Sequence, residues 1–77
     1  MNTRQDIERA RQGILQEING LIDQRRGLMA RQQKLKAGKP KRGYEALVNQ
    51  SIKRYGSEIA EINRRIGMLE ANLEGLA

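Results

Sequence analysis

Residues 48–76, VNQSIKRYGSEIAEINRRIGMLEANLEGL, carry large apolar side chains at alternating spacings of four and three residues. The pattern repeats every seven residues, which is two turns of an α-helix, and it therefore places one continuous apolar seam along a helix. The seam consists of Val48, Ile52, Tyr55, Ile59, Ile62, Ile66, Leu69, Leu73 and Leu76. We predict a coiled-coil-like helix from about residue 44 to about residue 74.

A second long helix is predicted over residues 4–37, with Thr3 and Asp6 resembling a capping box at its start. Apolar residues occupy every seventh position of this segment, at Ile7, Ile14, Leu21, Leu28 and Leu35. Arg25 and Gln32 stand at intervening positions where apolar residues are expected. We interpret them as residues that fix the register, with Arg25 reaching Glu58. The alternative is a polar layer that lines a ligand site between subunits.

Residues 37–43, AGKPKRG, separate the two predicted helices. Gly38 suits the end of a helix, and Pro40 cannot continue one. The apolar positions on the two sides lie at equal distances from Lys41 and Arg42, so an antiparallel hairpin folded there brings them to equal heights. We therefore predict an all-α fold in which residues 1–77 form a single helical-hairpin domain with a basic connector at 38–43.

In this register we expect further contacts between the two helices. It pairs Glu17 with Arg65 and Arg9 with Glu74. It also places Gly27 opposite Gly56, which would make these two glycines a point of closest approach.

The helix over residues 4–37 has more apolar surface than one partner helix covers. Leu15, Ile22 and Met29 form a second stripe, and three glycines recur at the same period although each costs a helix roughly 1 kcal/mol relative to alanine. A 77-residue chain without cysteine has no disulfides to support a small core. We expect a homo-oligomer, either a homodimeric four-helix bundle or a larger helical assembly. The predicted interface is Gly13, Leu15, Gly20, Ile22, Gly27 and Met29.

Positive charge is concentrated in the middle of the chain. Residues 25–54 hold ten bases and one acid, a net charge of +9, whereas residues 1–24 carry −1 and residues 55–77 carry −2. In a hairpin these bases gather at the connector end, where they would attract phosphates. We expect Tyr44 to stack on a nucleobase. The predicted nucleic-acid contacts are Arg31, Lys36, Lys39, Lys41, Arg42, Tyr44, Lys53 and Arg54. The alternative is a solvated face without a ligand.

Catalysis is not expected, because the chain has no histidine and no cysteine to act as a general base or nucleophile. We assign no catalytic residue, no metal ligand and no cofactor. No apolar run approaches the ~20 residues of a membrane span, and the polar residues 1–11 do not resemble a signal peptide. We therefore expect a cytoplasmic protein without a membrane partner.

The primary functional hypothesis is binding of nucleic acid or a nucleotide ligand by the basic end. The alternative is a small inhibitor or adaptor that docks on a target protein, for example a phage-borne anti-defence protein, and a third hypothesis is a filament subunit. The predicted architecture resembles the plasmid copy-number protein Rop, a hairpin that dimerises and binds RNA, and the two-helix ribosomal proteins. It is also similar to type III secretion needle subunits. These are resemblances of shape without a shared motif.

Overall fold

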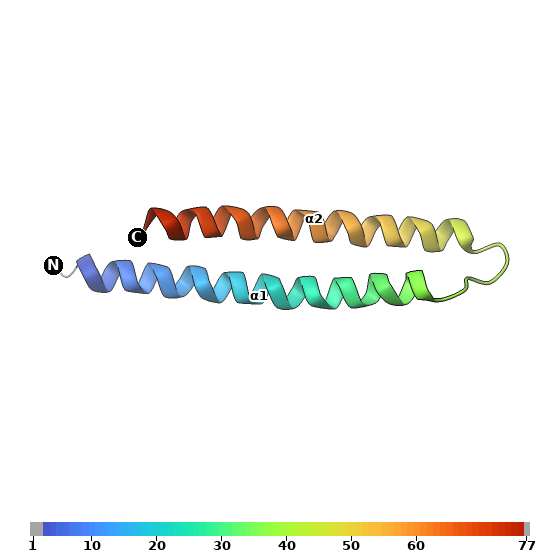
Figure 1. Ribbon diagram of the computed structural model, residues 1–77, viewed down its shortest axis with the longest axis horizontal. Coiled ribbons are helices and arrows are strands. Elements are labelled where there is room, and N and C mark those ends of the chain that lie inside the picture. The colour runs from blue at the N-terminus through green and yellow to red at the C-terminus, as the bar shows by residue number, and fades with distance from the viewer. Residues whose placement is uncertain (1–2, 77) are drawn as a thin grey trace.

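The computed structural model describes residues 3–76, which form two long helices and no strand. Helix α1 spans Thr3–Ala37 and helix α2 spans Glu45–Gly75. The two helices run antiparallel and side by side, with the termini at one end and the connector at the other (Figure 1). The Cα trace measures 66 × 15 × 13 Å, so the hairpin is a thin rod. The predicted all-helical hairpin is confirmed, with helix bounds within one residue of those expected.

The core is small and lies in the middle of the rod. Ile18, Ile62 and Ile66 are the buried residues within the described part of the chain, and each keeps 7 to 8 % of its surface exposed. The partly buried residues that pack against them are Ile14, Leu21, Ile22, Leu28 and Leu69. Two packed helices bury only one seam, so no side chain here is enclosed on all sides.

Two contacts between the helices, together with the hydrogen bond of Arg25 described below, fix their register. Arg65 lies 3.5 Å from Glu17, which confirms the predicted ion pair. Gln32 donates a hydrogen bond from Nε2 to the carbonyl oxygen of Ile52, at 3.1 Å.

The partner predicted for Arg25 is wrong. Its guanidinium donates to the amide oxygen of Asn63 at 2.7 Å and forms no ion pair with Glu58. Arg9 and Glu74 also form no ion pair. Arg25 and Gln32 thus both reach polar groups of α2, which favours the interpretation that they set the register.

The predicted close approach of Gly27 and Gly56 is also wrong. A Cβ atom added to Gly27 would meet nothing within 4 Å, whereas one added to Gly56 would lie 3.3 Å from Nε2 of Gln32. Gly56 therefore makes room for the side chain of Gln32 and not for the backbone of α1.

The last turn of the connector spans residues 41–44, where the Tyr44 N–H donates to the Lys41 carbonyl at 2.9 Å. Helix α1 ends at Ala37 as predicted, and the Gly38 N–H still donates to the Lys34 carbonyl at 3.1 Å. Gly43 has the positive φ of 94°, which is the only such value in the described residues. Its N–H donates to the Glu45 carboxylate at 2.9 Å, and this contact holds the connector against the start of α2.

Two glycine substitutions should have opposite effects on stability. Gly20→Ala is expected to raise the free energy of unfolding by roughly 0.5–1 kcal/mol, because alanine favours a helix and the added methyl group meets nothing within 4 Å. Gly43→Ala should lower it by about 1–2 kcal/mol, because L-residues disfavour left-handed backbone. Urea unfolding followed by circular dichroism measures both. A loss of stability in Gly20→Ala would show that another backbone packs on this position.

The core can be tested by comparing a buried and an exposed apolar residue of α2. Ile62→Ala should lower the free energy of unfolding by roughly 2–5 kcal/mol, because it leaves a cavity in the middle of the seam. Leu47→Ala should change it by less than about 0.5 kcal/mol, since Leu47 is 58 % exposed. Equal effects in thermal or urea unfolding would contradict the observed packing.

Candidate nucleic-acid interface

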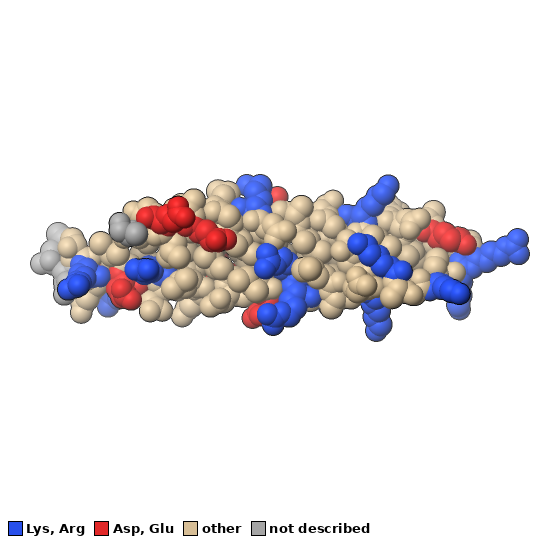
Figure 2. Space-filling view, in the orientation of Figure 1, with Lys and Arg blue, Asp and Glu red and all other residues tan. Residues whose placement is uncertain are grey.

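The connector end of the hairpin carries most of the positive charge. The ten bases of residues 25–54 lie in the half of the rod that contains the connector. Of the acids, Glu45 lies beside the connector, Asp23, Glu58 and Glu61 lie near the middle of the rod, and the other five lie toward the termini. Figure 2 shows one face: Lys and Arg side chains project from the connector end beside one acidic patch, whereas toward the termini acidic and basic side chains lie close to one another. We call the connector end with its basic side chains the basic tip.

All eight predicted contact residues are exposed. Arg31 and Lys36 belong to the last turns of α1, while Lys53 and Arg54 belong to α2. The remaining four occupy or border the connector: Lys39, Lys41, Arg42 and Tyr44. Tyr44 immediately precedes α2, makes no side-chain capping hydrogen bond, and is 56 % exposed, so its ring is free to stack.

These residues share one end of the rod but not one face of it. Arg31 lies four turns after Glu17, and Arg54 lies three turns before Arg65, so both are on the flank marked by the Glu17–Arg65 ion pair. Lys36 is about 140° around α1 from Arg31, and Lys53 is about 100° around α2 from Arg54. The basic tip is therefore surrounded by charge on all sides and does not form a single basic groove.

The hollow beside the connector is small. Lys34, Leu35, Gly38, Lys39, Pro40 and Val48 line a space of about 140 Å³. Pockets that enclose small-molecule ligands measure roughly 300–1,000 Å³. This hollow is thus too small to enclose a nucleotide. A larger hollow of the tip, of about 470 Å³, is lined by residues of α2 alone.

The structure adds two residues to the tip that the sequence patterns had not singled out. Leu47 is 58 % exposed and lines a hollow on α2 with Gln50, Ser51 and Arg54. The signal for it was an apolar residue directly before Val48 and outside the four-three pattern. Glu45 is the second addition, because its carboxylate accepts from Gly43 and places one negative charge within the basic tip.

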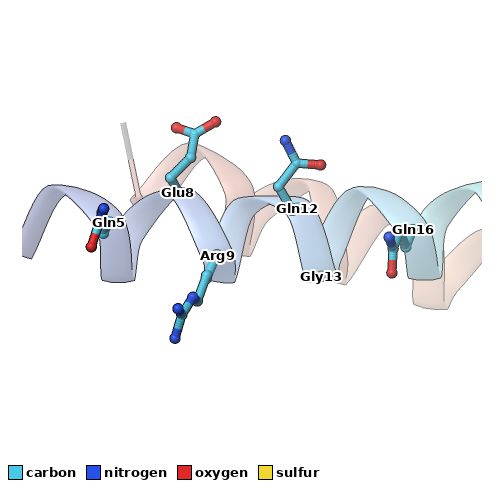
Figure 3. Close-up of a pocket in the computed structure, with 6 residues that line it drawn as sticks. All are labelled: Gln5, Glu8, Arg9, Gln12, Gly13 and Gln16. Atoms are coloured by element: carbon cyan, nitrogen blue, oxygen red, sulfur yellow. The ribbon is translucent and has the colours of Figure 1, made fainter.

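The other hollows are weaker candidates for a binding site. The largest lies on the outer face of α1 over Gly13 and is lined by residues of that helix alone. Figure 3 shows Glu8 and Gln12 pointing to one side of α1 and Arg9 to the opposite side, so their polar groups do not converge.

A second hollow, of about 250 Å³, lies between the helices on the Glu17–Arg65 flank, and Glu61 is among its lining residues. Arg64 donates two hydrogen bonds to the Glu61 carboxylate, and this lowers the pKa of Glu61 below its usual value. Glu61 therefore remains ionised at neutral pH and paired with a neighbour on its own helix.

The predicted oligomer interface divides into two surfaces. Each glycine precedes a residue of the second stripe by two positions, which places the two lines about 160° apart around α1. One partner helix cannot contact both. A Cβ atom at Gly13, Gly20 or Gly27 would meet nothing within 4 Å, so the hairpin itself leaves the glycine line open.

Two further observations concern residues 3–76. No group of three acidic, histidine or cysteine residues there is placed to hold a metal ion. Neither α1 nor α2 is long and apolar enough to cross a membrane.

Comparison with known proteins gives no relative for this chain. No family model, no curated protein and no solved structure matches it.

Proposed function

We propose that this chain is a non-enzymatic, self-associating helical hairpin that binds nucleic acid through its basic tip. The observation that carries the proposal is the segregation of charge, since residues 25–54 hold ten bases and one acid and the antiparallel fold collects them at one end. A polyanion gains from this arrangement because each phosphate contact releases condensed counterions.

The basic residues are spread around the tip, and this favours contacts with the phosphate backbone over recognition of nucleobase edges. Backbone contacts require charge within reach and no fixed groove, whereas reading a sequence requires side chains aligned along a groove. Lys39, Lys41 and Arg42 at the connector supply the central contacts. Tyr44, with its exposed ring, stacks on an unpaired base, which favours single strands and loops.

A specific observation also favours docking on a protein as the second candidate function. Tyr44 and Leu47 expose more than half of their surfaces beside the bases of the tip. Aromatic and apolar anchors surrounded by charge are typical of the centre of a protein interface. An inhibitor or adaptor would bind its target through these two residues, whereas a nucleic-acid-binding protein would bind through the Lys and Arg side chains.

Charge reversal at the tip tests the primary proposal. Lys41→Glu combined with Arg42→Glu should weaken binding to a labelled single-stranded oligonucleotide at least ~10-fold, because it removes two phosphate contacts and adds two repulsive charges. Arg4→Glu combined with Arg9→Glu is the matched control, with the same change in net charge at the opposite end of the rod. Fluorescence anisotropy measures both, and equal losses would contradict binding at the tip.

Salt dependence gives an independent check. The logarithm of the association constant should fall linearly with the logarithm of salt concentration, with a shallower slope in the tip variant. Undetectable affinity for both DNA and RNA at about 50 mM salt would exclude the proposal.

A pull-down from lysate with and without nuclease distinguishes docking on a protein from nucleic-acid binding. A protein target recovered directly survives the nuclease and is lost in Leu47→Asp, whereas material bridged by nucleic acid disappears after nuclease treatment.

A further inference from the structure

The second stripe of α1 remains uncovered in the hairpin. Leu15 and Met29 are 39 % and 51 % exposed, and Ile22 between them is half-buried against the core. The whole hairpin exposes 6447 Å² of surface, whereas a compact folded chain of 8.8 kDa exposes about 4,800 Å². The excess, about 1,700 Å², is larger than the ~800 Å² that each partner loses in a stable interface of standard size.

Opposite charges stand at the two ends of this stripe, at the same seven-residue spacing. Glu8 precedes Leu15 by seven residues, and Lys36 follows Met29 by seven. The line along one face of α1 therefore reads acid, three apolar residues, base, with Ile22 at its centre. Glu8 and Lys36 are both exposed and make no ion pair within the described hairpin.

We propose that a second copy of this chain packs on this face in the antiparallel direction, about a two-fold axis at Ile22. Each Glu8 then meets Lys36 of the second copy, each Leu15 meets Met29 of the second copy, and the two Ile22 side chains meet on the axis. The inference rests on the self-association included in the proposed function, and it names the surface and the orientation. The partner is fixed by self-complementarity, which a two-fold interface requires.

Charge excludes the parallel arrangement of the two hairpins. Side by side in the same direction, they would bring two segments of net charge +9 to one end. The antiparallel arrangement instead places each basic tip beside the terminal segments of the other copy, which carry −1 over residues 1–24 and −2 over residues 55–77. Like charges facing each other disfavour an alternative register or direction more strongly than exposed pairs stabilise the correct one.

The glycine line is the competing surface, and it supplies a matched control. Asp6 and Lys34 flank Gly13, Gly20 and Gly27 at the same seven-residue spacing, so this line has the same order of charges. It offers no apolar side chain to bury, whereas the second stripe offers three. A second copy seated at Ile22 leaves the glycine line in water.

Sedimentation equilibrium without nucleic acid tests the surface. The unmodified chain should be a dimer, Glu8→Lys or Lys36→Glu alone should weaken it at least ~10-fold, and the double variant should restore it. The corresponding exchanges at Asp6 and Lys34 should leave the dimer within ~2-fold. Circular dichroism confirms that each variant is helical, and all four sites are exposed. A monomeric unmodified chain, or a dimer sensitive to Asp6 and Lys34 only, would overturn the inference.

A single spin label tests the orientation. The chain has no cysteine, so Ala37→Cys gives one label per copy at the exposed end of α1. Ala37 lies 15 residues from Ile22, which predicts a separation of about 45 Å between labels in the antiparallel dimer and below about 20 Å in a parallel one. The short distance would overturn the proposed direction. These results do not depend on nucleic-acid binding, so a failure of either proposal is recognised separately.

Discussion

Burial of a single narrow seam between two antiparallel helices is the interaction on which the rest of this structure depends. Two helices alone leave the flanks of the rod uncovered, so among residues 3–76 only Ile18, Ile62 and Ile66 reach the buried state. Heptad seams tolerate displacement by whole repeats, because apolar layers then meet other apolar layers. The contacts of Gln32 and Arg25 with α2 oppose such displacement, since in the observed register Gln32 fits over Gly56 and Arg25 reaches the Asn63 amide.

The helices and their pairing follow from short-range regularities of the sequence. The four-three spacing defines the seam of α2, and Pro40 with its neighbouring glycine defines the break, so the helix bounds were predicted within one residue. The partner of Arg25 was not predictable in this way. It depends on the rotation of each helix about its own axis, which places the amide oxygen of Asn63 within reach of the guanidinium.

The sequence predicted which end of the molecule carries the positive charge. The run of charged residues alone did not show how their side chains are distributed around the rod. Any antiparallel hairpin brings a basic connector to one end. Whether Lys53 and Arg54 share a face depends on helical geometry, in which adjacent residues diverge by about 100°. The same geometry separates the glycine line from the second stripe, although the two interleave in sequence. A seven-residue periodicity identifies residues that form one line along a helix. The angle between two such lines shows whether one partner helix can contact both.

The rod shape and the segregated charge together give the single hairpin a large electric moment along its 66 Å axis. In the field of a polyanion this moment produces a torque, which turns the molecule before contact so that the connector leads. A single hairpin is therefore pre-oriented during diffusion. When two hairpins pair in opposite directions, their moments cancel, and the assembly approaches without a preferred leading end. Its rate of encounter then depends on net charge alone, and either end can arrive first.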